Sequence, residues 1–141
     1  MKIDLVGMWM DEVAIGAELL SGLGDAREGA AFTTEFMMDA IQDRFPGKAY
    51  CLVEEWIIFR ADLSHDELTK VNEAGHIPLF VFAHRVVQDS RRRFQMGDWV
   101  RSSMCVTFRE GYMFETKNTV YLLMGNGEER VASLNAIFSF F

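Results

Sequence analysis

Apolar positions follow a helical spacing in the first half of the chain and a strand-like spacing in the second half. The spacing predicts an amphipathic helix over residues 27–44, which Pro46 and Gly47 end. A shorter helix is expected over 65–74, because Ser64 and Glu67 have the spacing of a capping box and Gly75 follows as a C-terminal cap. Residues 11–20 could form a further helix, weakened by Gly16.

The remaining apolar runs are rich in β-branched and aromatic residues and are short, which is typical of strands. The expected strands are 49–60, 79–87, 98–108, 112–116, 119–124 and 130–134. Glu54 and Glu55 interrupt the first of these and indicate an irregularity or an exposed edge. The triplet Gly125-Asn126-Gly127 predicts a hairpin, because tight hairpin turns need residues that tolerate positive φ.

These elements predict a single α+β domain over residues 1–141. Its N-terminal helices would pack on a mostly antiparallel sheet, or on a small SH3-like barrel of about five strands, in the C-terminal half. The strand at 49–59 is expected to join that sheet. Phe138, Phe140 and Phe141 are expected to be buried, either within the domain or against a second copy, because soluble chains avoid exposing such a tail.

Composition agrees with a globular protein. The 141 residues are 50% hydrophobic and 25% charged, with a net charge of −7. Residues 1–75 carry 15 acids and 6 bases, whereas residues 76–141 carry 6 acids and 8 bases. The overall acidity disfavours non-specific nucleic-acid binding, but it leaves room for a local basic patch. No apolar run approaches the roughly 20 residues that span a bilayer, so a cytoplasmic protein without membrane attachment is expected.

Four short sequence segments resemble those of a known family: Gly75-His76, residues 83–87, residues 97–101 and residues 118–125. They resemble a family of small bacterial proteins of unknown function, found often on genomic islands and other mobile elements of gammaproteobacteria. The resemblance covers about residues 45–135. It implies no activity, and it assigns no functional residue.

Basic and aromatic residues of the second half are the main candidates for a binding site. Arg91, Arg92 and Arg93 form the one cationic run, and Trp99 and Arg101 follow closely. Such a run is usually a solvated loop, but with an aromatic neighbour it could contact nucleic acid. A second open question is whether the aromatic series Trp99, Tyr112, Phe114 and Tyr121 belongs to the core or to a binding face.

Enzyme chemistry has weaker support. His84 lies in an apolar strand and could act with Cys51 or Cys105 as nucleophile and with Asp89 as orienting acid. Neither cysteine begins a helix or has a basic neighbour in sequence, so both are expected to be reduced, buried thiols. The spacing of His65, His76 and His84 matches no compact metal motif, and no cofactor is expected.

The sequence therefore favours a non-enzymatic interaction or regulatory module of a bacterial mobile element, with a protein as partner. A homodimer is possible. The alternatives are a nucleic-acid-binding module that uses Arg91, Arg92, Arg93 and Trp99, and a small enzyme that uses His84.

Overall fold

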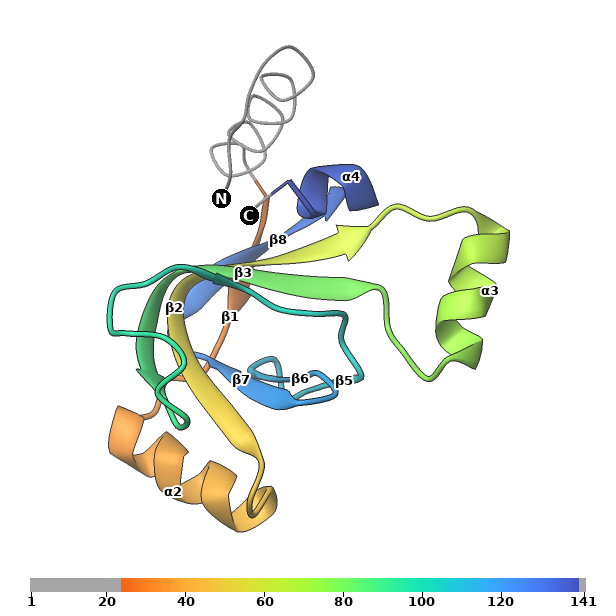
Figure 1. Ribbon diagram of the computed structural model, residues 1–141. Helices are drawn as coiled ribbons and strands as arrows, with labels where there is room; N and C mark the ends of the chain where they lie inside the picture. Colours follow the sequence, from red (N-terminus) through yellow and green to blue (C-terminus); the bar gives the residue numbers. More distant parts are fainter. Residues whose placement is uncertain (1–23, 140–141) are drawn as a thin grey trace.

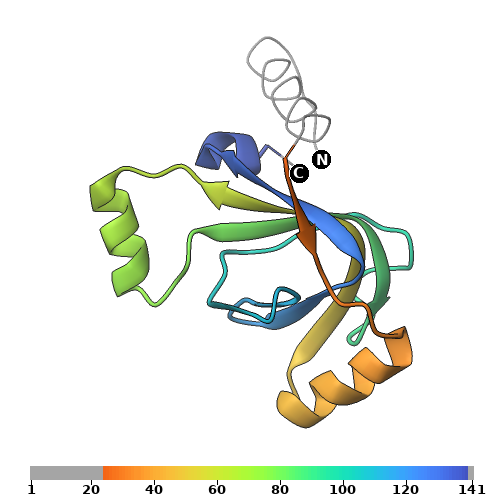
Figure 2. The same ribbon diagram turned by 180° about the vertical axis from the view of Figure 1, so that it is seen from behind.

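The computed structural model describes residues 24–139, which form one curled eight-stranded sheet with three helices, two between strands and one after the last strand (Figures 1 and 2). The elements in chain order are β1 (Asp25–Glu28), α2 (Thr34–Arg44), β2 (Ala49–Ala61), α3 (His65–Glu73), β3 (Leu79–Asp89), β4 (Val100–Arg101), β5 (Thr107–Arg109), β6 (Met113–Glu115), β7 (Thr119–Leu123), β8 (Asn126–Ala132) and α4 (Leu134–Ile137). The strand order is β1-β8-β2-β7-β6-β5, and β3 pairs with both β2 and β4.

The long strand β2 is the centre of the sheet. Along one edge it pairs antiparallel with β3. Along its other edge its first half pairs parallel with β7 and its second half pairs parallel with β8. The sheet is therefore mixed, and its strong curl gives a half-barrel (Figure 1).

An irregularity in the middle of β2 exchanges the two faces of the strand. Glu55 has a positive φ of 54°, which the pleated conformation does not allow. Cys51 and Val53 point into the half-barrel before it, and Trp56 and Ile58 do so after it. Alternation with a period of two would have placed Trp56 on the outer face. The acidic pair therefore marks a real break, as the sequence indicated.

The β7–β8 line is kinked opposite this break. Val53 pairs with Leu123 and Ile57 with Glu128, so the β7–β8 line has one residue more than β2 between these pairs. The buried Trp56 ring occupies the kink, and its indole N–H donates to the carbonyl of Met124 at 3.2 Å. A Cβ on Gly127 would lie 2.3 Å from that ring, so only glycine fits there.

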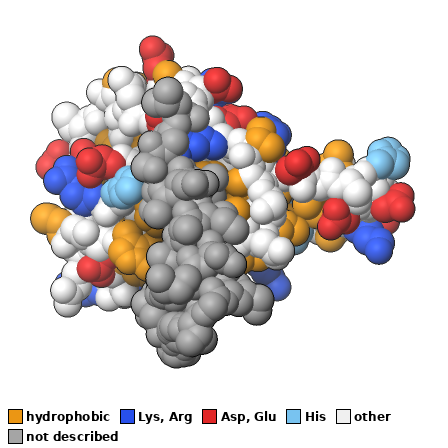
Figure 3. Space-filling model, turned by 90° about the horizontal axis from the view of Figure 1, so that it is seen from above, with side chains coloured by type: hydrophobic (Ala, Val, Ile, Leu, Met, Phe, Trp, Pro, Cys, Tyr) orange, Lys and Arg blue, Asp and Glu red, His pale blue; other side chains and the backbone are white. Residues whose placement is uncertain are grey.

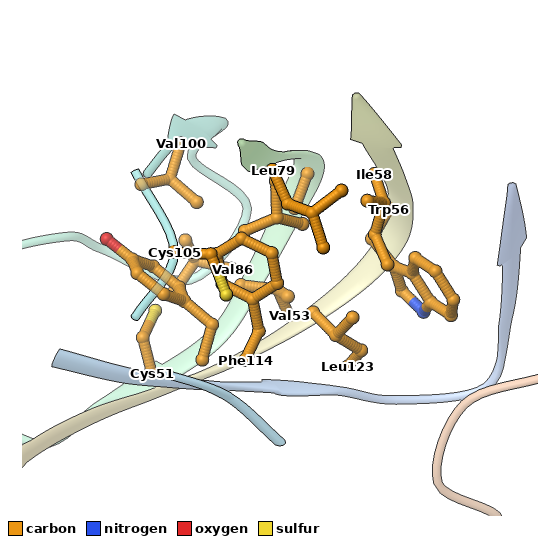
Figure 4. Packing of buried hydrophobic residues seen from close by; sticks show 13 residues of the cluster. Cys51, Val53, Trp56, Ile58, Leu79, Val86, Val100, Cys105, Phe114 and Leu123 are labelled. Carbon is orange, nitrogen blue, oxygen red and sulfur yellow. The ribbon is translucent and has the colours of Figure 1, made fainter. Parts of the chain in front are cut away.

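The inside of the curl holds the inner cluster, whose side chains point toward one another from strands on all sides (Figure 4). Its thirteen buried residues are Cys51, Val53, Trp56, Ile58, Leu79, Val81, Ala83, Val86, Val100, Cys105, Phe114, Tyr121 and Leu123. Burial of this apolar surface is the main stabilisation of the fold.

Two helices cover separate parts of the outer face. Met37 and Ile41 of α2, one turn apart, pack on Tyr50, Leu52 and neighbouring residues of β7. At the other end of β2, α4 packs its own apolar residues on that strand and on β3. The switch at Glu55 makes this possible, because it lets β2 present apolar side chains outward at both ends.

The remaining helix, α3, projects away from the sheet and carries charged side chains (Figures 1 and 3). None of its residues is buried. The expected capping box is present: Glu67 N–H donates to the Ser64 hydroxyl at 3.2 Å, and Ser64 N–H donates to the Glu67 carboxylate at 2.9 Å. Gly75 has the positive φ of a C-terminal cap, 81°.

The α+β class is confirmed, but the predicted arrangement is wrong. The helices are interspersed among the strands and do not form an N-terminal layer, and the sheet is mixed because β2 has parallel neighbours. Residues 25–28 form strand β1, on the edge of β8, where the sequence pattern predicted the start of a helix. The possible helix at 11–20 lies outside the described residues.

The predicted hairpin at Gly125-Asn126-Gly127 is also wrong. Strands β7 and β8 run in the same direction beside β2, so the triplet bends one continuous line and does not reverse it. Gly125 has a positive φ of 70°, whereas Gly127 is required by the close approach of Trp56. A glycine-rich kink and a glycine-rich turn need the same residues, which explains the error.

Two segments expected as strands are shorter or different. Residues 98–108 contribute only β4 and the start of β5. The chain turns helical at Leu134, where Ser133 caps α4 by accepting from the Ala136 N–H at 3.1 Å. Phe138 ends this helix and stays 39% exposed, so its predicted burial within the domain is wrong, whereas burial against a second copy stays a prediction. Phe140 and Phe141 lie outside the described residues.

We expect Gly127→Ala to lower the free energy of unfolding by about 1–3 kcal/mol, because the added methyl group overlaps the Trp56 ring. Gly75→Asn is the control, since nothing lies near its Cβ position and Asn tolerates positive φ. Denaturant unfolding measures both. The packing would be contradicted if both substitutions had the same small effect, or if Trp56→Leu failed to reduce the cost of Gly127→Ala.

We expect Ser64→Ala to destabilise α3 locally by about 1 kcal/mol, through loss of the cap. Because no residue of α3 is buried, the helix can open without the sheet. Amide hydrogen exchange should therefore accelerate about fivefold over residues 65–73 and stay constant in β3. Unchanged exchange in α3 would show that the capping box does not hold this helix.

Candidate anion-binding cleft

Three segments meet at one end of the half-barrel and enclose an open cleft of about 670 Å³. They are residues 46–49 before and at the start of β2, Arg91 and Arg93 after β3, and residues 117–118 in the turn between β6 and β7. Strand register brings them together, because Ala49 pairs with Thr119 and Cys51 pairs with Asp89. The cleft therefore follows directly from the pairing of β2 with both neighbours.

Every charged side chain that lines this cleft, among the described residues, is a cation: Lys48, Arg91, Arg93 and Lys117. Arg92 stands beside them, exposed and with a positive φ of 55°. A lining whose charged side chains are all cations favours the entry of an anion.

Arg93 is fixed from below by a buried carboxylate. The Asp89 side chain is fully buried and accepts from Arg93 at Nε (3.0 Å), at Nη2 (2.6 Å) and at the backbone N–H (2.7 Å). The Nη1 group of Arg93 donates to the Thr119 hydroxyl at 2.8 Å. The guanidinium plane is therefore held rigidly, while about a third of the side chain, 35%, stays exposed.

The other cations are less tightly held. Lys48 pairs with Glu115 and also donates to the Thr116 carbonyl at 3.0 Å. Arg91 donates to the Gly47 carbonyl at 2.7 Å, which uses one of its five N–H groups. Asp89 and Glu115 offset the charges of Arg93 and Lys48, whereas Arg91, Arg92 and Lys117 form no ion pair with any residue in the described range 24–139.

Burial and hydrogen bonding have opposite effects on the pKa of the Asp89 carboxyl group. Burial raises the pKa of its carboxyl group, but hydrogen bonds from the side chain and backbone of Arg93 outweigh burial, so the pKa lies below its ordinary value. Asp89 is therefore ionised at neutral pH. It acts as a permanent anchor for Arg93.

Trp99 and His84, predicted as site residues, do not line this cleft. Trp99 lies 46% exposed with its ring stacked on Phe82, the ring centroids being 5.6 Å apart. His84 meets the same Phe82 ring edge-on at 5.0 Å and borders a second hollow of about 290 Å³ near Glu55 and Glu128. Trp99 therefore does not share the cleft lining with Arg91 and Arg93, although the sequence grouped these residues in one site.

Arg101 belongs to the Trp99 side of the molecule and not to the cleft. Its guanidinium carbon lies 5.0 Å from the centre of the Phe138 ring, and burial lowers the pKa of the guanidinium. In the aromatic series, Phe114 and Tyr121 are buried in the inner cluster and Tyr112 packs against it. The core interpretation therefore holds for Phe114 and Tyr121, whereas Tyr112 is partly buried and Trp99 is exposed.

Both cysteines are free, buried thiols, as expected. Burial raises the pKa of Cys51 to about 12, with a further contribution from Asp89, and burial likewise raises the pKa of Cys105 to about 12. A thiol with such a pKa is almost entirely protonated at neutral pH and is a poor nucleophile.

Within residues 24–139, no group of three histidine, cysteine or acidic side chains is placed to hold a metal ion. Over the same residues, no helix has the length and apolar character needed to cross a membrane.

Sequence reasoning identified the arginines of the cleft but missed Lys48 and Lys117. Lys48 follows the turn signal Pro46-Gly47, and Lys117 lies in the turn between β6 and β7. The strand pairing that unites them is parallel and long-range, between Ala49 and Thr119. A topology built only from antiparallel hairpins does not contain that parallel pairing. Sequence reasoning therefore did not group the two lysines with the arginines.

Comparison with known proteins places the chain in a family. Residues 28–139 match the model described as a domain of unknown function, DUF6957, and the chain belongs to this family. The match starts before residue 45 and so extends beyond the segment that carried the resemblance. No curated protein matches the chain, and no solved structure matches it.

We expect Asp89→Asn to lower the free energy of unfolding by about 3 kcal/mol at pH 7, because Arg93 loses its ionised partner. The depressed pKa of Asp89 contributes stability that is present above about pH 4 and is lost as pH falls through the folded-state pKa. Melting curves from pH 7 to pH 3 should therefore show a flatter acid limb for the variant. An identical acid limb in the two proteins would contradict the anchoring role.

Proposed function

We propose that this protein is a non-enzymatic interaction module that binds an anionic group of its partner in the basic cleft. The observation that carries this proposal is the convergence of Lys48, Arg91, Arg93 and Lys117 from three separate segments on one open space. The cleft volume lies within the range of pockets that hold small ligands or a side-chain-sized group of a larger partner.

The side chain of Arg93 is also preorganised for binding. Asp89 and Thr119 fix the Arg93 plane, so little side-chain entropy is lost when an anion meets it. Arg91 and Lys117 are exposed cations of the lining, and such a charge changes the association rate and its dependence on salt. Binding without chemistry also accords with the state of the two cysteines, whose pKa values of about 12 keep them protonated.

The cellular role rests on the sequence resemblance. An accessory or regulatory protein of a bacterial mobile element would act through such a module by engaging another macromolecule. A homodimer remains a prediction of the sequence, and the size of the protein in solution would test it.

We expect fluorescent polyglutamate to bind the full chain at low salt and to bind Lys117→Glu about tenfold more weakly, because an attraction becomes a repulsion. Lys70→Glu on α3 is the matched control: it is an exposed lysine far from the cleft, and its reversal changes the net charge equally. Anisotropy titrations measure both affinities. Equal weakening by the two substitutions would show that net charge, and not the cleft, determines binding.

A further inference from the structure

The cations of the cleft differ in what they can offer a ligand. Arg91 has spare N–H groups after its bond to Gly47, and Lys117 has no hydrogen bond to any described residue. These two side chains can therefore meet anionic oxygens directly. Both line the cleft, Arg91 after β3 and Lys117 before β7, and these two strands flank the start of β2.

Arg93 offers a flat surface. Three of its five N–H groups are already committed to Asp89 and Thr119, and these bonds lie in the guanidinium plane. The Arg93 guanidinium carbon lies 5.5 Å from the centre of the Phe94 ring, so an aromatic group supports the cation. Phe94 covers one face of the guanidinium, so the opposite face and two N–H groups remain for a ligand, and planar aromatic groups stack on such faces.

We infer that the cleft takes a single-stranded nucleic acid, with one base stacked on Arg93 and the adjacent phosphates held by Arg91 and Lys117. This inference rests on the proposed function, because it names the ligand of the same cleft. A strand of nucleotides alternates planar bases with phosphates and so matches a flat cation between two open ones. An acidic peptide supplies carboxylates but no regular planar group.

The charge around the cleft limits the length of strand that is bound. The protein carries a net charge of −7, and the preceding helix α2 presents Glu35, Asp39 and Asp43 at its surface. A long polyanion lying across the molecule would meet these acids. The footprint is therefore about three phosphates, two held by Arg91 and Lys117 in the cleft and a third beside the cleft at the exposed Arg92, and the salt dependence should be shallow.

The test is an anisotropy titration of the full chain with a labelled oligothymidylate of about 12 nucleotides. We expect dissociation constants in the micromolar range at low salt. A plot of log K against log salt concentration should have a slope of about −2, because each of about three phosphates contributes about −0.7 to the slope. A strand of the same length without bases should bind about tenfold more weakly, because the stacking is lost. Lys117→Glu should weaken binding, and Lys70→Glu should not.

The outcomes separate this inference from the proposed function. If the abasic strand or polyglutamate binds as tightly as oligothymidylate, or if a duplex binds more tightly, the single-strand inference is wrong and the anion-binding module stands. If no anion binds the cleft, both are wrong. Arg93→Lys keeps the charge and removes the plane, so it should weaken the binding of oligothymidylate more than the binding of polyglutamate, and equal weakening of the two would contradict the stacked base. The comparison of strands with and without bases uses the unaltered protein and decides the matter even if that variant does not fold.

Discussion

The fold depends on the packing of one tryptophan against one kink. Trp56 enters the half-barrel only because the break at Glu55 exchanges the faces of β2. Its ring then fills the bend between β7 and β8, where the absence of a side chain on Gly127 gives it room. This contact sets where β2 stops pairing with β7 and starts pairing with β8. A shift of one residue there would exchange buried and exposed side chains along the whole central strand.

The same register builds the cleft at the end of the half-barrel. Pairing of β2 with β7 brings the turn holding Lys117 beside Lys48, and pairing of β2 with β3 brings Asp89 beside the start of β2. The sheet therefore brings the segments together, and the local bond between Asp89 and Arg93, four residues apart, orients Arg93. A protein with a net charge of −7 thus concentrates positive charge in one small region. Screening in physiological salt, with a Debye length of about 8 Å, lets such a region act independently of the distant acids.

The sequence predicted the local features and missed the long-range ones. The capping box at Ser64 and the irregularity at the acidic pair of β2 could be predicted because each depends on neighbouring residues alone. The kink at Gly125 was predicted as a hairpin, since both structures need glycine, and only parallel pairing with β2 distinguishes them. The arginine run was recognised as a candidate, whereas Lys48 and Lys117 required that same pairing. Trp99, predicted beside the arginines, instead stacks on Phe82.

The most direct test of the account is amide chemical-shift mapping with isotopically labelled protein during titration with oligothymidylate. The account predicts that the shifts concentrate in three separate segments, residues 46–49, 91–93 and 117–118, with the largest changes at the arginines. The amides of His84 and Trp99 should keep their positions, because both side chains lie outside the cleft lining. Shifts centred on His84 and Trp99, or spread evenly over the surface, would contradict the assignment of the cleft as the binding site.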